Sequence, residues 1–132
     1  MHRISTRLLV LSTLAIATSA FAADPPKVVP LMNQPLVKQP NQEVVVLTVE
    51  YGPGQSSPPH RHNADVFVYV LEGKVTMAVQ GKDAVTLGPG QTFHESPSDI
   101  HSISRNASDS APAKFLVFMV KDKGAPATTP VQ

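Results

Sequence analysis

The sequence predicts an all-β fold, a barrel or sandwich of short antiparallel strands, for most of its 132 residues. Two observations carry this prediction. Short runs of valine, leucine and aromatic residues recur at a spacing of roughly 8–12 residues, and turns rich in glycine and proline separate them. Beyond the N-terminal segment, no window shows the sustained apolar period of about 3.6 residues that an amphipathic helix requires.

The first segment, residues 1–22, is predicted to be a signal peptide and not part of the fold. Arg3 and Arg7 give it a basic start, a short apolar run follows, and Ala20 and Ala22 form a small-residue end. This order is typical of a secretory signal peptide, and the apolar run is shorter than the roughly 20 residues of a membrane-spanning helix. We therefore expect cleavage near Ala22, a periplasmic or secreted location, and no stable membrane insertion after cleavage.

The two flanks of the predicted domain contain several prolines. Residues 23–42 include five of them, and proline cannot sit inside a central strand because it has no amide proton. This segment is predicted to be an extended N-terminal arm. Residues 122–132 are small, polar or proline and are predicted to be a flexible tail. The β-barrel domain is then expected to span residues 43–121.

Within this domain we expect seven strands. Their predicted bounds are 44–49, 66–71, 75–79, 84–87, 91–94, 101–104 and 115–120. Glu72-Gly73, between two valine-rich runs, predicts a tight hairpin. Since alternate residues of a strand face opposite sides, an unbroken strand would place His60, His62 and Val66 on one face.

The charge balance argues against some classes of partner. Loss of Arg3 and Arg7 from the 11 basic residues leaves nine against ten acidic ones, a net charge of about −1 with neutral histidines. This composition does not fit a nucleic-acid partner or a polybasic membrane patch. The chain has no cysteine, so a disulfide framework is excluded.

Four histidines lie within 42 residues of the predicted mature chain, at His60, His62, His94 and His101. A His-x-His pair on a strand sets two imidazoles side by side, where both can chelate one ion. Such a pair also occurs on ordinary solvated strands. Its meaning therefore depends on the residues around it.

Glycines and histidines recur in a particular order across the predicted strands. The order is Gly54, His60-x-His62 and Gly73, then Leu87–Phe93 (LGPGQTF), Pro97, His101 and Asn106. This pattern resembles the two motifs of the cupin superfamily, and in a chain of this length it resembles a small single-domain cupin. The resemblance covers about residues 44–120. It implies an antiparallel β-barrel of about six to eight strands, the double-stranded β-helix or jelly roll.

The resemblance also implies a metal site. Cupins usually hold a divalent metal with two histidines and a glutamate of the first motif and one histidine of the second. By this pattern His60, His62 and His101 are metal ligands, and the glutamate position is occupied by Val66, which cannot donate an electron pair. Asp65 is adjacent, but strand alternation points it to the opposite face.

Three interpretations of the site remain open at this point. The three histidines alone make an open site, which suits iron, zinc, copper, nickel or manganese. Alternatively, His94 or Glu95 replaces the missing glutamate, and only one of these neighbours can face inward on a strand. In the third interpretation the metal is lost and the barrel binds an organic ligand or nothing. Glu95 is also the one candidate for a catalytic residue.

The function expected from the resemblance is that of a metal-dependent, dioxygenase-like oxidoreductase acting on a small organic molecule, and the predicted signal peptide implies that it is exported. The alternative is a non-catalytic small-molecule or metal-binding protein of the cell envelope. A homodimer is a candidate assembly, because small cupins often dimerise through a sheet.

Overall fold

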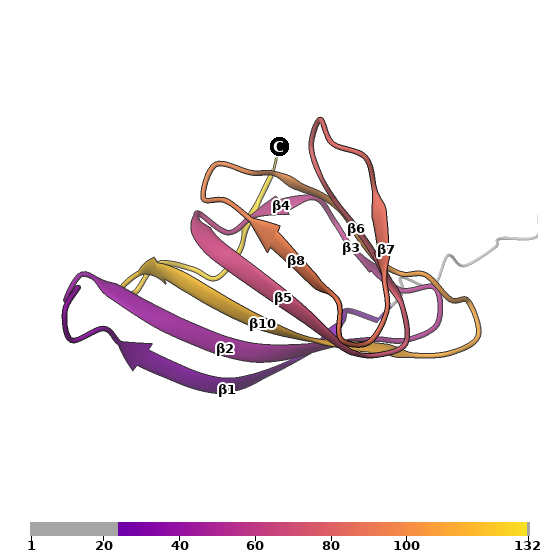
Figure 1. The fold of residues 1–132 in the computed structure, drawn as a ribbon, viewed down its shortest axis with the longest axis horizontal. Coiled ribbons are helices and arrows are strands. Elements are labelled where there is room, and N and C mark those ends of the chain that lie inside the picture. Colours follow the sequence, from indigo (N-terminus) through magenta and orange to yellow (C-terminus); the bar gives the residue numbers. More distant parts are fainter. Residues whose placement is uncertain (1–23, 132) are drawn as a thin grey trace, which may run out of the picture.

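Residues 24–131, which the computed structural model describes, form two antiparallel sheets that face each other. The predicted signal peptide, residues 1–22, lies outside the described residues. Figure 1 shows β1, β2 and β10 side by side in one sheet and β3, β6 and β7 in the other. In this part of the chain no helix is long and apolar enough to cross a membrane. The prediction of an all-β fold is confirmed.

Each sheet is built from strands that are far apart in the sequence. The first sheet contains, in spatial order, β1 (Lys27–Pro35), β2 (Gln42–Tyr51), β10 (Ala113–Asp122), β5 (Ala64–Glu72) and β8 (Thr92–Glu95). The second contains β11 (Thr129–Pro130), β4 (His60–Arg61), β9 (His101–Asn106), β6 (Val75–Val79) and β7 (Val85–Leu87), with β3 (Ser56–Ser57) paired to β9.

The core lies between the sheets and follows from strand alternation. In β5 the buried residues are Ala64, Val66, Val68 and Val70, whereas the intervening side chains face outward. The facing residues of β10 and β6 complete the same apolar cluster. Burial of this apolar surface stabilises the fold at roughly 25 cal/mol per Å².

The proline-containing segment 23–42 was expected to be an arm separate from the domain. The structure places its β1 in the first sheet, where β1 pairs with β2 along its whole length with an irregularity between Pro30 and Met32. β1 is the edge strand of that sheet. A proline is tolerated there because one side of an edge strand needs no ladder hydrogen bonds. The first sheet therefore begins before residue 43.

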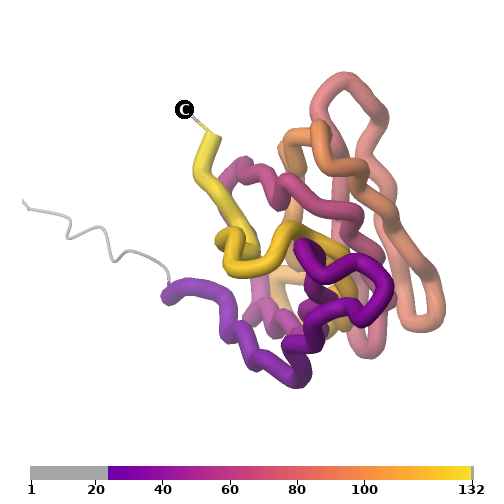
Figure 2. The backbone as a smooth tube through the Cα atoms, turned by 90° about the vertical axis from the view of Figure 1, so that its left-hand side faces the viewer, coloured from indigo at the N-terminus to yellow at the C-terminus, as the bar shows by residue number. Residues whose placement is uncertain are grey.

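The C-terminal segment, expected to be a flexible tail, is also part of the fold. After β10 the chain turns back, and β11 pairs with β4, with Pro130 opposite His60. A buried ion pair holds the turn, because the Lys121 ammonium donates to the Glu43 carboxylate and to the carbonyl of Ala125. Figure 2 shows the first (indigo) and last (yellow) described segments at the same side of the molecule.

The turn after β5 is a corner between the two sheets and not the predicted hairpin. β5 pairs with β10 and β8, whereas β6 pairs with β9 and β7. Gly73 makes the corner with a φ of 69°, and a Cβ there would meet the backbone of Pro112 and Ala113. Glycine is needed because it alone combines this φ with such a close approach.

Candidate metal centre

Three of the four histidines that are candidates for the site converge at the end of β4. His60 lies directly opposite His101 of β9, and His62 follows β4 at the bend that leads into β5. Asn63 makes this bend with a φ of 50° and so carries the chain from one sheet to the other. One ring nitrogen from each histidine lies within 4.8 Å of the other two. The histidines that the sequence predicted as ligands are therefore positioned to bind a metal ion.

Backbone carbonyls orient two of these rings. His60 Nδ1 lies 2.8 Å from the Pro58 carbonyl oxygen, and His62 Nδ1 lies 2.7 Å from that of Ala127. A carbonyl only accepts hydrogen bonds, so both Nδ1 atoms donate and each neutral ring keeps its lone pair on Nε2. The two Nε2 atoms are 3.1 Å apart. Two facing lone pairs at this distance repel unless a proton or a cation lies between them.

The buried environment favours the neutral form of His60. Burial lowers the pKa of the His60 imidazole, and the neighbouring His62 and His101 rings lower it further, although the Pro58 carbonyl and Glu95 act in the opposite direction. A neutral imidazole is the form that binds metals. A cation between the two Nε2 atoms therefore fits this site better than a proton does.

The third histidine, His101, is only 3% exposed and is stacked against Phe93. Neither of its ring nitrogens has a hydrogen-bond partner among the described residues. Its Nδ1 lies 3.1 Å from Glu95 Oε1, but the two atoms are not aligned as a hydrogen bond. Buried polar groups in proteins are nearly always partnered, so a ring with two such nitrogens fits a site that receives a ligand.

The orientation of β8 in the first sheet determines which of His94 and Glu95 faces the site. Glu95 points inward, is 2% exposed, and places Oε2 3.7 Å from His62 Nε2. His94 points outward and pairs with Asp65 at 3.2 Å, both about half exposed. The structure therefore does not bring His94 or Asp65 to the three histidines. It does bring Glu95, which the sequence offered only as an alternative to His94.

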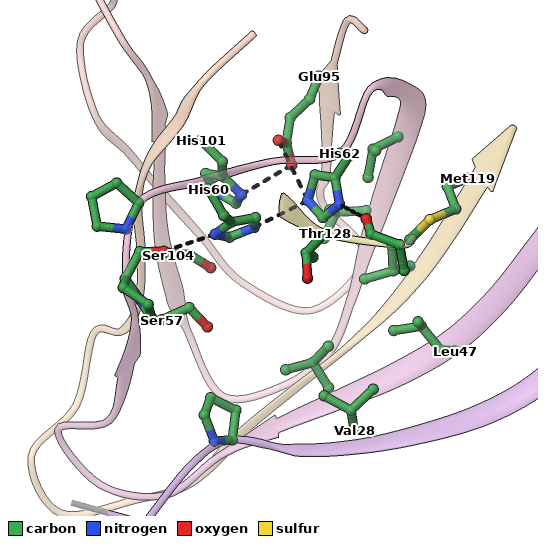
Figure 3. Close-up of a pocket in the computed structure, with 18 of the residues that line it drawn as sticks. Val28, Leu47, Ser57, His60, His62, Glu95, His101, Ser104, Met119 and Thr128 are labelled. Carbon is green, nitrogen blue, oxygen red and sulfur yellow. Dashed lines mark hydrogen bonds and ion pairs between the residues drawn. The ribbon is translucent and has the colours of Figure 1, made fainter. Parts of the chain in front are cut away.

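The histidines open into a cavity of about 570 Å³ between the two sheets. Figure 3 shows the side chains of His60, His62, His101 and Glu95 pointing toward one another. Most of the remaining wall is apolar, with Leu47, Val49, Val66, Val68, Phe115, Val117 and Met119 among its residues. Both chain ends contribute as well, through Pro25, Pro26 and Val28 and through 127–131. No signal in the sequence pointed to these two segments as parts of the site.

A cluster of hydroxyl groups also lines the cavity. The Tyr51 hydroxyl lies 2.7 Å from Ser57 Oγ and 2.7 Å from Ser104 Oγ. Burial raises the pKa of the Tyr51 phenol, so this group stays protonated at neutral pH. The two hydrogen bonds use two of the three hydroxyl hydrogens, which leaves one for a ligand in the cavity. No sequence pattern indicates this cluster, because its members come from three separate strands.

The chemistry of the donors fits a transition metal. Three imidazole nitrogens with one carboxylate at the rim form a mixed nitrogen and oxygen set of the kind that zinc, iron, copper and nickel accept. Alkaline-earth ions prefer sites made of oxygen ligands. The orphaned nitrogens of His101 and the facing Nε2 atoms of His60 and His62 are the observations of this structure that fit a bound ion.

Comparison with solved structures shows which proteins share this fold. A DMSP lyase, DddQ, from Ruegeria pomeroyi DSS-3 is 20% identical with a TM-score of 0.66, over 82% of this chain and 52% of its own length. An uncharacterised conserved protein with a double-stranded β-helix domain from Klebsiella pneumoniae is 16% identical with a TM-score of 0.66, over 84% of this chain and 88% of that one. An oxalate oxidase in complex with the substrate analogue glycolate is 19% identical with a TM-score of 0.63, and the match covers 83% of this chain and 57% of the oxidase chain.

These likenesses concern the fold, and this chain spans about half the length of the DMSP lyase. No curated protein sequence matches the chain. The model of the cupin domain family matches residues 47–119, more than half of the sequence, and this range includes all three converging histidines. The strand order, the buried histidine cluster and the family match agree, and the chain belongs to the cupin family.

Proposed function

We propose that this protein is an exported metalloprotein in which His60, His62 and His101 hold a divalent transition metal that acts on a small organic molecule in the adjoining cavity. The observation that carries the proposal is the pair of Nε2 atoms of His60 and His62, 3.1 Å apart with both Nδ1 atoms on carbonyls. Such fixed ring orientations accompany metal-ligating histidines and raise their affinity for the ion.

The reaction class that we propose is that of a dioxygenase-like oxidoreductase. The chemistry that a bound metal supplies is an open coordination position, where oxygen and the organic substrate can meet. Where the organic substrate itself supplies all four electrons that reduce oxygen, as in oxidative cleavage of a carbon–carbon bond of an enol or diketone, both oxygen atoms end in the products and no external reductant is consumed. The neighbours described as a DMSP lyase and an oxalate oxidase support a small organic molecule as the substrate of this barrel.

The walls of the cavity limit what this substrate can be. Among residues 24–131, those that line it include no lysine, arginine or aspartate, and Glu95 is the one carboxylate. A substrate would therefore be held by the centre itself, by apolar contact, and by the free hydroxyl hydrogen of the Tyr51 cluster. We infer a mainly apolar molecule with oxygen atoms at one end, such as a diketone or an enol.

The same scarcity of charged side chains favours a second candidate function, a non-catalytic metal or small-molecule binding protein of the cell envelope. Apart from the three histidines and Glu95, Tyr51 is the one titratable residue in the cavity wall formed by the described residues. Few groups there could move protons during a reaction. Oxygen consumption distinguishes the two candidates, because the non-catalytic protein binds metal without consuming oxygen.

The test combines metal analysis with an oxygen electrode. The protein is prepared without metal, loaded in turn with iron, zinc, copper, nickel and manganese, and assayed by elemental analysis and with flavonol, diketone and thiol substrates. We expect about one bound ion per chain, none in His60→Ala, and oxygen uptake with one of the metals. Bound metal without oxygen uptake would favour the non-catalytic function. Absence of bound metal would overturn the metalloprotein proposal.

Export is the part of the proposal that rests on residues 1–22. The basic start, the apolar run and the Ala20-Phe21-Ala22 end support it. Expression of the full chain in a bacterium that has a periplasm tests it. We expect the periplasmic fraction to contain a protein whose intact mass lacks the residues up to Ala22. A full-length mass in the membrane fraction would contradict export.

A further inference from the structure

We propose that Glu95 is the carboxylate ligand of the metal centre, delivered from β8 instead of from position 66 of β5. This inference deepens the proposed function and rests on it, because it concerns the same ion. In the family pattern the carboxylate comes from the strand that holds Val66. The geometry of this chain points to the neighbouring strand.

The strand register brings positions 66 and 95 to the same place. β5 and β8 are antiparallel neighbours, and Val66 and Glu95 are direct partners in their ladder. Side chains of directly paired residues project to the same face of the sheet with Cβ atoms about 5 Å apart. Both residues are almost fully buried, at 1% and 2% exposure. A carboxylate on either strand therefore enters the same space beside the histidines.

One distance from Glu95 fits two ligands of one ion, although the group of ligand atoms that lie within 4.8 Å of one another contains the three histidines and not Glu95. Two atoms that each lie about 2.1 Å from a metal are at most about 4.2 Å apart. His60 Nε2 and His62 Nε2 are 3.1 Å apart, and Glu95 Oε2 is 3.7 Å from His62 Nε2. Both separations are within this limit. Figure 3 shows dashed lines from the Glu95 carboxylate to the rings of His62 and His101.

The unpartnered burial of Glu95 supports the same assignment. Oε1 has no hydrogen-bond partner among the described residues, and the cavity wall that they form contains no lysine or arginine. Buried polar atoms in proteins nearly always have a partner. A metal ion held beside His62 would supply one for this carboxylate.

The position of Glu95 also allows a lesser role, in which it only orients His101 through Nδ1. Glu95→Gln separates the two roles. Its amide oxygen can occupy the same place beside His101 Nδ1, but the amide has lost the negative charge and is a poor metal ligand. Loss of a partner that merely orients a ligand costs roughly 10- to 100-fold in metal affinity.

The experiment measures binding of cobalt(II) and zinc(II) by competition with a chelator, together with the visible absorption spectrum of the cobalt form. We expect Glu95→Gln to lower the affinity by more than about 100-fold, beyond the orienting range, and to change the cobalt spectrum. Asp65→Asn is the matched control, because it removes the same charge one residue before Val66 from a side chain that faces outward. It should change neither quantity.

The second variant moves the carboxylate from β8 to β5 by exchanging two residues. Val66→Glu combined with Glu95→Val returns the carboxylate to β5 at nearly constant core volume, and we expect it to restore the affinity to within about tenfold of wild type. This variant also decides the matter if Glu95→Gln folds poorly. An unchanged affinity and cobalt spectrum in Glu95→Gln, or an exchange variant that folds and binds as weakly as a His60→Ala protein, would overturn the inference. A wild-type protein that binds no metal would instead overturn the proposed function.

Discussion

His62 Nδ1 donates a hydrogen bond to the carbonyl oxygen of Ala127 over 2.7 Å, and this bond joins a candidate metal ligand to the C-terminal segment of the chain. The two residues are 65 positions apart in the sequence. The pairing of β11 with β4 holds Ala127 in place, and β4 itself carries His60. The C-terminal segment thus both closes the cavity and orients one of the rings.

Removal of this segment should therefore weaken metal binding. We expect deletion of residues 126–132 to lower the affinity by roughly 10- to 100-fold, because His62 loses the acceptor that fixes its ring. Deletion of only residues 131–132 is the matched control, since it keeps Ala127 and both residues of β11. The measurement is chelator competition, with circular dichroism to verify folding. Equal affinities in the two truncated proteins would contradict the role assigned to the Ala127 carbonyl.

Substitution of single histidines should distinguish the three proposed metal ligands from the histidine that lies outside the site. We expect His60→Ala, His62→Ala and His101→Ala each to abolish stoichiometric binding, because each removes one of three converging nitrogens. His94→Ala is the control and should bind metal as wild type does, since its ring pairs with Asp65 on the outer face. Elemental analysis after dialysis provides the measurement. If His94→Ala lost its metal while the other three variants kept theirs, the assignment of His60, His62 and His101 as the ligands would be contradicted.

The strand periodicity predicts the all-β fold, and the resemblance to the cupin motifs implies the three histidines as ligands. The sequence does not determine which side chains of β8 face the cavity. His94 and Glu95 alternate, but the alternation alone does not reveal which of them points inward. That choice depends on the register with β5, in which Glu95 pairs with Val66, and register is a property of the assembled sheet.

The strands and the turn that sequence patterns did not predict correctly each have a physical reason. β3, β4 and β11 have two residues each, too few for a period to be visible. β1 is interrupted by proline, which lowers its strand propensity and is tolerated only because β1 lies at an edge. The Glu72-Gly73 turn has the composition of a hairpin, but its flanking strands find their partners elsewhere.

Substitution of Gly73, at the corner, should destabilise the fold more than substitution of Gly81. In Gly73→Ala the new Cβ would lie 2.8 Å from Ala113 Cα and would also clash with the Pro112 carbonyl. Gly81→Ala is the matched control, because Gly81 has a φ of 83° but open space around it. We expect about 1–2 kcal/mol of destabilisation from the left-handed backbone alone in Gly81→Ala and clearly more in Gly73→Ala. Urea denaturation measures both, and equal losses would contradict the steric argument.

The ion pair between Glu43 and Lys121 should make stability depend on pH. The hydrogen bond from Lys121 and then that from the Gly124 amide lower the pKa of Glu43 from its ordinary value of 4.5. A carboxyl group whose pKa is lower in the folded state stabilises the protein fully above its unfolded pKa. This contribution is lost as the pH falls from about 4.5 through the folded pKa.

The difference in unfolding free energy between wild type and Glu43→Gln isolates this group from other acids that titrate in the same range. We expect Glu43→Gln to be less stable at pH 7, because Lys121 is left buried beside a neutral amide, and the difference to shrink as the pH falls below about 4.5. Urea denaturation of the metal-free proteins from pH 7 to pH 3 measures it. Glu72→Gln, at an exposed position, controls for general loss of charge. A difference that stays constant over this range would show that the charge of Glu43 does not stabilise the turn that leads to the C-terminal segment.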